Sequence, residues 1–337
     1  MNFPDFQKFI IQTSEQSLRR ISVFNPLTIH KKGKRSKAIF ALALVCFFWG
    51  TTWVAAKIGV SYMPPLQMAG IRQLLGGLCF ILFFLYKGER WPRGKEWGPI
   101  LVLSLLNFLL SNGLSTWGVK YISAGLGAIM GSIFPLWLVI IGLFAKGNRM
   151  PAKAIIGMIL GFGGICLIFY EHLSDFLNSD FLFGILLSLA ATWSWAFGTL
   201  YTKKNAANFN PYFSLGLQMV ISAVCLILFT QTTGIGVSFT AIPWQSWAAI
   251  GYLVIFGSIT TFIAYIYALQ NLPTEQVSIY AYINPIVALL VGAAIFPGKQ
   301  LTPFIAIGGL VALSGVFLVN KAFKAIPPPE QPETEGI

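Results

Sequence analysis

Charge is scarce in this sequence. Only 10% of the 337 residues are charged, whereas 56% are hydrophobic. A soluble domain carries about 25% charged residues. The apolar residues form long blocks of roughly 20, the length that a helix needs to cross a bilayer. Because the short alternating segments of a membrane β-barrel are absent, the sequence predicts an all-α integral membrane protein.

Acidic residues and histidines are few. The chain has 11 Asp and Glu and two His, and no acid falls inside an apolar block. An integral-membrane enzyme would need a carboxylate, histidine or metal cluster near a membrane face. Proton-coupled transporters usually relay protons through carboxylates. Glu275, at the start of one block, could be a proton relay. It could also be a charge at a helix N-terminus, where the helix dipole favours an acid.

Cofactor motifs are also missing. The four cysteines fall in apolar blocks, and no CxxC pair or Cys/His cluster exists, so no metal site or disulfide is indicated. No GxxxxGK[ST] sequence points to ATP. We expect no cofactor and no metal.

A channel would need a charge ring or a filter loop, and a receptor usually carries a soluble domain. An integral-membrane enzyme and a channel or receptor remain the alternatives to a transporter.

Ten transmembrane helices are expected from the apolar blocks. Before them, residues 1–37 form a basic arm ending in HKKGKRSK, either an interfacial helix or a disordered segment. Residues 324–337, with PPPEQPETEG, are too polar and proline-rich to pack and are expected to be disordered. The expected spans are 38–58, 65–86, 98–119, 123–145, 152–170, 181–202, 211–231, 246–269, 275–296 and 302–321.

The net charge of +12 does not indicate nucleic-acid binding, because the basic residues lie mostly between the apolar spans. Their distribution instead predicts how the spans are oriented in the membrane. If the N-terminus is cytoplasmic, most of the 23 Lys and Arg fall in cytoplasmic segments. The exceptions are Lys57, Lys120 and Lys299 outside and Arg72 within a span. This bias is typical of membrane proteins. We therefore predict that both termini are cytoplasmic.

The chain repeats itself. YISAGLGAIMGSIFP at Tyr121–Pro135 is echoed 150 positions later by NLPTEQVSIYAYINP at Asn271–Pro285. Rare residues match at similar offsets, such as Trp49 with Trp195. The two copies, 38–170 and 181–323, hold five spans each. An odd number inserts the second copy upside down, so we predict two inverted five-helix repeats, an arrangement typical of secondary transporters.

The blocks FFWGTTWVAAK, PPLQMAGIRQLLGG, KYISAGLGAIMGSIFPLW and NLPTEQVSIYAYINPIVALLVG resemble EamA-type members of the drug/metabolite transporter superfamily. The resemblance covers roughly residues 38–322. It implies a ten-helix inverted-repeat bundle in a bacterial inner membrane that exports or exchanges small metabolites, often amino acids. Acidic residues that often follow the fourth and ninth spans are replaced here by KGNR and PGKQ, so no role is carried over for them.

Arg72 is the charge that lies deep in a span. Such an arginine normally faces the bundle interior and has a partner. It could anchor a substrate carboxylate. It could equally be a structural residue bonded to helix carbonyls, or one that snorkels from a tilted helix, and the family resemblance favours the structural interpretation.

Aromatic and polar residues complete the predicted substrate site. Trp49 and Trp195 are too deep to be interfacial anchors, so they either wall a cavity or pack in the core. The remaining candidates are Asn107, Ser111, Tyr265, Tyr280 and Asn284. Each could instead bond a neighbouring helix, but their convergence on three spans indicates a polar path. The sequence thus predicts a secondary transporter of a small molecule in the lipid bilayer, a monomer by preference or a dimer, without nucleic acid.

Overall fold

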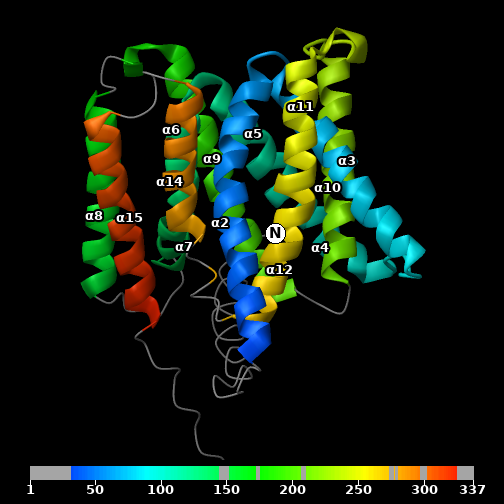
Figure 1. The fold of residues 1–337 in the computed structure, drawn as a ribbon, viewed down its shortest axis with the longest axis horizontal. Helices are drawn as coiled ribbons and strands as arrows, with labels where there is room; N and C mark the ends of the chain where they lie inside the picture. Colours follow the sequence, from blue (N-terminus) through cyan, green and yellow to red (C-terminus); the bar gives the residue numbers. More distant parts are fainter. Residues whose placement is uncertain are drawn as a thin grey trace, which may run out of the picture.

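The computed structural model describes residues 32–143, 152–171, 175–205, 210–272, 277, 280–296 and 302–324. These residues fold entirely into helices and connecting turns, with no strand among them (Figure 1). Six helices are long and apolar enough to cross a membrane. Three shorter apolar helical stretches, Ile155–Ile168, Tyr280–Ile295 and Pro303–Val319, accompany them. The prediction of an all-α membrane protein is confirmed.

Each predicted span is represented by helix. The first two spans are α2 (Lys32–Val60) and α3 (Pro65–Tyr86), and the next are built from several pieces. The third comprises α4 (Trp97–Leu103), η2 (Ser104–Asn112) and α5 (Gly113–Tyr121), and the fourth comprises α6 (Ala124–Ser132) and α7 (Phe134–Leu143). The others are α8 (Ala152–Glu171), α9 (Ser179–Asn205), α10 (Pro211–Thr232), α11 (Trp244–Tyr252) with η5 (Leu253–Thr260) and α12 (Thr261–Asn271), α14 (Tyr280–Ile295) and α15 (Pro303–Lys324). Short 3₁₀ turns lie at Gly94–Glu96, Asp175–Leu177 and Phe239–Ala241.

Two features of these helices were not predicted. Helix α2 begins at Lys32, so its first turn extends into the basic arm. The fourth span is interrupted at Ile133, and Pro135 is the second residue of α7. Proline is tolerated in a first helical turn because the N–H it lacks would have no helical partner there. Residues 1–31, Glu275 and residues 325–337 lie outside the described part of the chain.

Prolines also start the second span of each half. Pro65 and Pro211 occupy the first positions of α3 and α10. Asn210 precedes α10, and its Oδ1 accepts hydrogen bonds from the backbone N–H groups of Tyr212 and Phe213. These bonds satisfy donors that a helix start leaves free.

The third and eighth spans each contain a π-helical stretch, η2 and η5. Such stretches are rare and often occur at functional sites. Neighbouring helices bond to η2: Ser194 of α9 donates to Leu106 O (2.7 Å), and Ser104 donates to Gln218 O of α10 (2.8 Å). In η5, Gly257 O accepts from Trp49 of α2 (3.3 Å). The π-helical turns therefore sit at the crossing points of the bundle.

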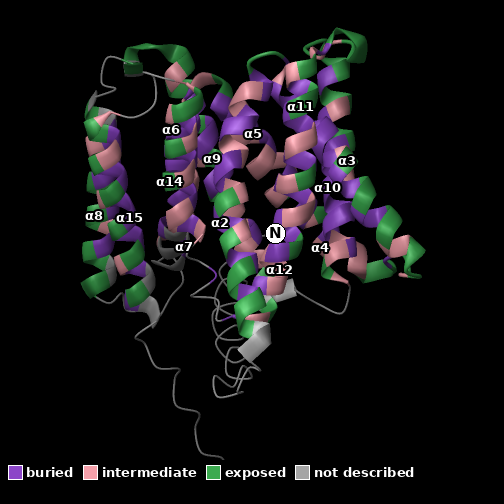
Figure 2. Ribbon diagram, in the orientation of Figure 1, coloured by how far each residue is buried: buried purple, intermediate pink, exposed green. Residues whose placement is uncertain are grey.

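Glycines allow two helix pairs to approach closely on opposite sides of the bundle, α3 with α10 and α8 with α15 (Figure 1). A Cβ added to Gly77 would lie 2.8 Å from Gly216 O, and one added to Gly157 would lie 2.7 Å from Gly315 O. Figure 2 shows exposed residues on the outer faces of these pairs and buried residues toward the centre. The two pairs thus flank a central group of helices that includes α2, α5, α6, α9, α12 and α14.

Candidate functional site

A central cavity of about 190 Å³ lies among these helices. Its volume is below the roughly 300–1,000 Å³ of sites for drug-sized ligands, so it suits a small solute. Both halves of the chain contribute to its walls. Of the predicted site residues, the ones on the lining are Trp49, Arg72, Asn107, Ser111, Trp195, Tyr280 and Asn284.

Aromatic rings gather around Trp49 at one end of the cavity. The Trp49 ring lies 5.0 Å from the ring of Tyr265 and 5.0 Å from that of Tyr280, between centroids. The rings of Tyr265 and Tyr280 lie 5.7 Å apart, between centroids, and are nearly perpendicular. Tyr265 is therefore placed behind Trp49 and Tyr280 and does not line the cavity itself. The cluster joins α2, α12 and α14.

Trp53 forms a second aromatic wall. Its indole packs on Gly127 and Gly131 of α6, where added Cβ atoms would lie 3.1 and 2.8 Å from ring atoms. This GxxxG pair therefore makes room for a cavity side chain rather than for another helix backbone. In the other GxxxG pair, Gly157 of α8 instead faces the backbone of α15, and Gly161 faces the Leu136 side chain of α7.

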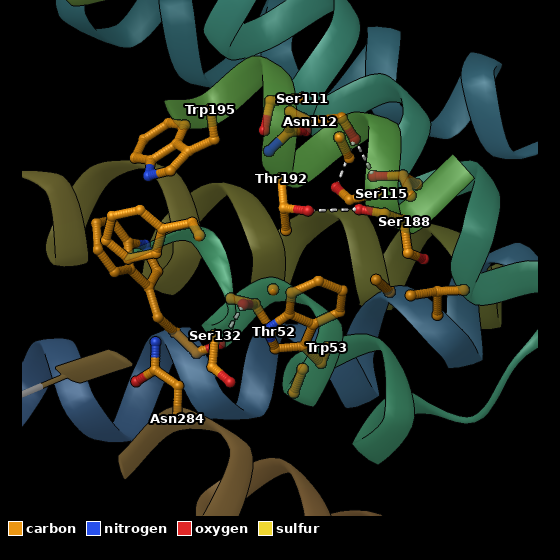
Figure 3. Close-up of a pocket in the computed structure, with 18 of the residues that line it drawn as sticks. Thr52, Trp53, Ser111, Asn112, Ser115, Ser132, Ser188, Thr192, Trp195 and Asn284 are labelled. Atoms are coloured by element: carbon orange, nitrogen blue, oxygen red, sulfur yellow. Dashed lines mark hydrogen bonds between the residues drawn. The ribbon is translucent and has the colours of Figure 1, made fainter. Parts of the chain in front are cut away.

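Polar side chains line the opposite wall, where Ser111, Asn112, Thr192 and Ser188 lie close together (Figure 3). Asn107, Ser111 and Ser115 come from one face of the third span, as their spacing predicts. The Asn107 Oδ1 atom is buried without a hydrogen-bond partner. It lies against Gly198 of α9, where any larger residue would collide with it.

Asn284 acts mainly between helices. With the amide oriented to suit its neighbours, Nδ2 donates to Cys46 O (2.9 Å) and Tyr280 O (3.0 Å). The bond to Cys46 O ties α14 to α2, the bond to Tyr280 O stays within α14, and the residue still borders the cavity. Asn284 thus bonds a neighbouring helix and also lies on the cavity lining.

Two cations lie near the cavity in different environments. Lys57 Nζ donates to three backbone oxygens at the end of the third span, those of Val119 (2.8 Å), Lys120 (3.0 Å) and Ile122 (2.8 Å). Arg72 is 9% exposed, and its Nε donates to Ser258 Oγ at 3.3 Å. Among the described residues, Arg72 makes no bond to a helix carbonyl and no ion pair.

Sequence reasoning did not single out several hydroxyl residues on the lining, namely Thr52, Ser132, Ser188 and Thr192. Serine and threonine in membrane helices often bond back to their own helix. Ser188 and Thr192 do so, donating to Gly184 O and Ser188 O. Their spacing with Trp195, at i, i+4 and i+7, marks one face of α9 and is the signal that could have found them.

The described residues contain no group of three or more His, Cys, Asp or Glu that could hold a metal ion. The free cysteines Cys79, Cys166 and Cys225 are exposed on the helix surfaces, and Cys46 is buried. The cavity therefore offers hydroxyl, amide, aromatic and guanidinium groups to a solute.

Comparisons with known proteins agree with this architecture. The EamA-like transporter family matches residues 36–170 and again residues 182–321. Uncharacterized transporter YvbV of Bacillus subtilis (strain 168) is 29% identical over 301 residues, covering 88% of this chain and 95% of the relative. Uncharacterized inner membrane transporter YedA of Escherichia coli (strain K12) is 30% identical over 261 residues, covering 77% and 81%.

A solved crystal structure shares the fold, with a TM-score of 0.60 at 16% identity, over 87% of this chain and all of that chain. The family match extends over most of the described helices, and the relatives are named as transporters. The chain therefore belongs to the EamA-like transporter family and is a multi-pass membrane transporter.

Proposed function

We propose that this protein is a secondary transporter that exports or exchanges small metabolites by alternating access through the central cavity. The observation that carries the proposal is the cavity itself, small and lined by aromatic and polar side chains from both halves. Amino acids are the first class to test, because the family resemblance implies them and the cavity offers both apolar and hydrogen-bonding surface.

The proposed substrate-binding residues are Trp49, Arg72, Asn107, Ser111, Trp195, Tyr280 and Asn284, with Tyr265 supporting Trp49 and Tyr280 from behind. Aromatic rings would bury the apolar part of the solute. The amide, hydroxyl and guanidinium groups would orient its polar part. This division is the usual one in small-molecule sites.

Alternating access is supported by a correspondence between the halves. The π-helical stretch of the third span is held by the sixth and seventh spans, α9 and α10. The stretch of the eighth span is held by the first and second spans, α2 and α3. In two inverted repeats of five helices, the third helix of each repeat would contact the first two helices of the other repeat. Such repeats can rock around a site at the midplane of the membrane. We further propose a cell-membrane location with both termini cytoplasmic, and a monomer as the working unit.

Flux into proteoliposomes tests the function. The purified protein would be reconstituted and offered radiolabelled amino acids and nucleosides, with and without a pH gradient. We expect protein-dependent uptake of at least one small metabolite and faster uptake when the same solute is loaded inside. Absence of flux or binding across a broad panel would reject the transporter assignment.

A further inference from the structure

The charge inside the cavity limits which solutes the proposed transporter can carry. Arg72 is the charged residue on the described lining, and no Asp or Glu stands there. An arginine at the centre of a membrane helix costs about 3 kcal/mol on insertion scales. A charge in such a place is normally paired. Here the protein itself provides no anionic partner among its described residues.

Lys57 shows how this chain satisfies a cation when its role is structural. Three backbone oxygens surround its ammonium group. Arg72 lacks such a set and bonds one neutral hydroxyl, that of Ser258. A structural arginine bonded to helix carbonyls, one of the interpretations that the sequence allowed, is therefore not what the structure describes.

The single bond of Arg72 also sets the direction of the guanidinium. Because Nε is occupied by Ser258 Oγ, the two terminal nitrogens remain available. One of them, Nη2, lies beside Gly257, since a Cβ added there would be 3.5 Å from it. That Cβ would also be 2.8 Å from Thr52 Cγ2, and Thr52 lines the cavity. The terminal nitrogens of the Arg72 guanidinium therefore lie at the cavity wall.

We propose that Arg72 is the counter-charge for the solute, and that the cavity selects small molecules bearing a carboxylate. Two terminal N–H groups of one guanidinium match the two oxygens of a carboxylate. An amine without a carboxylate would bring a second positive charge into a cavity that already holds one. This inference rests on the proposed function and adds the charge class of the substrate to it.

Binding to the protein in lipid nanodiscs would test the inference with charge-matched probes. One set is 3-phenylpropionate, 3-phenylpropionamide and phenethylamine, and a smaller set is butyrate, butyramide and butylamine. At constant ionic strength, we expect the carboxylates to raise the unfolding temperature and to bind roughly tenfold to hundredfold more tightly than the amides. The amines should bind more weakly still.

Variants would assign the preference to one side chain. Arg72→Gln should abolish the preference for carboxylates, and Arg72→Lys should keep part of it because the charge remains. Ser258→Ala should weaken carboxylate binding less, since Ser258 only positions the guanidinium. Arg93→Gln, at an exposed loop arginine, is the matched control and should bind as the wild type does.

The outcomes separate this inference from the proposed function. Equal binding of amides or amines by the wild type would overturn it, and this comparison needs no variant to fold. A carboxylate preference that persists in Arg72→Gln would also overturn it. Protein-dependent flux limited to neutral or cationic solutes would reject the counter-charge while leaving the transporter intact. Absence of flux for every solute would instead reject the proposed function.

Discussion

At the scale of single residues, Tyr280 links the cavity wall to the ring behind it. Its ring lies 5.0 Å from that of Trp49 and 5.7 Å from that of Tyr265, between centroids, and both pairs are edge-to-face. Such a pair is worth about 0.5–1.5 kcal/mol beyond the area that it buries. The position of Trp49 at the cavity wall therefore depends in part on the Tyr280 ring.

Tyr280→Leu removes the aromatic ring and keeps an apolar side chain. We expect the variant to fold but to transport its solute several-fold more slowly, because Trp49 loses an aromatic neighbour at the cavity wall. Initial rates in proteoliposomes measure the effect. Tyr86→Leu, at an 86% exposed position, is the control. Equal rates for Tyr280→Leu and the wild type would show that the ring has no role in the site.

Lys57 stabilises the end of the third span. Lys57→Met should lower the free energy of unfolding by roughly 1–3 kcal/mol, because three carbonyl oxygens lose a charged donor. Thermal unfolding followed by size-exclusion chromatography measures the change. Lys120→Met removes a cation that lies 5.7 Å from the Tyr121 ring centroid and bonds no carbonyl in the described part of the chain. A matching loss in both variants would contradict the capping role.

At the scale of elements, glycines determine how closely paired helices approach each other. A Cβ on Gly164 of α8 would lie 2.6 Å from Gly308 O and 2.8 Å from Ala312 Cα of α15, whereas one on the adjacent Gly163 would meet nothing within 4 Å. Neighbouring glycines thus have opposite environments.

Gly164→Ala should destabilise the protein by roughly 1–3 kcal/mol, since backbone atoms must move apart. Gly163→Ala should leave stability unchanged or slightly raised, because alanine favours helix over glycine. The melting temperatures of the two purified variants make the comparison. The contact between α8 and α15 would be misplaced if Gly163→Ala proved the more harmful.

The π-helical stretch η2 depends on α9 at a specific point. Gly198→Ala would push its Cβ into the Asn107 amide, whose Cγ lies 2.8 Å from that position. We expect reduced transport with a modest change in stability, because the displaced side chain borders the cavity. Gly251→Ala, where a Cβ would meet nothing within 4 Å, is the control, and flux and melting temperature are measured for both. Normal flux in Gly198→Ala would place Asn107 outside the site.

Some elements could be predicted and others could not. Apolar blocks of the right length predicted where helix occurs, because membrane spans need internal backbone bonding. The π-helical stretches had no sequence signal, since they depend on bonds from α9, α10, α2 and α3. The break at Ile133 between α6 and α7 was likewise not predicted.

At the scale of the whole molecule, the candidate site follows from residues far apart in the sequence. Asn107 and Ser111 were predicted to lie on a polar path through the bundle, and both border the cavity. Tyr265 was predicted on the same basis but lies behind other rings. Spacing identifies the face of a helix, but it cannot tell which neighbour covers that face.

The charge bias predicts one orientation for the whole bundle. Single cysteines at Ser61 and Lys87, both exposed near helix ends, would be introduced in a background lacking the four native cysteines. An impermeant maleimide added to intact cells should label Ser61→Cys but reach Lys87→Cys only after permeabilisation. The opposite pattern would invert the topology and put the termini outside.

The three tryptophans on the cavity wall, Trp49, Trp53 and Trp195, give the molecule a built-in optical reporter. Indole emission responds to nearby charge and to loss of water. Solute binding beside Arg72 would change both around these rings. With the chain's other tryptophans replaced by phenylalanine, emission from the remaining three would follow occupancy in unlabelled protein, so the substrate could be sought by titration before any flux is measured.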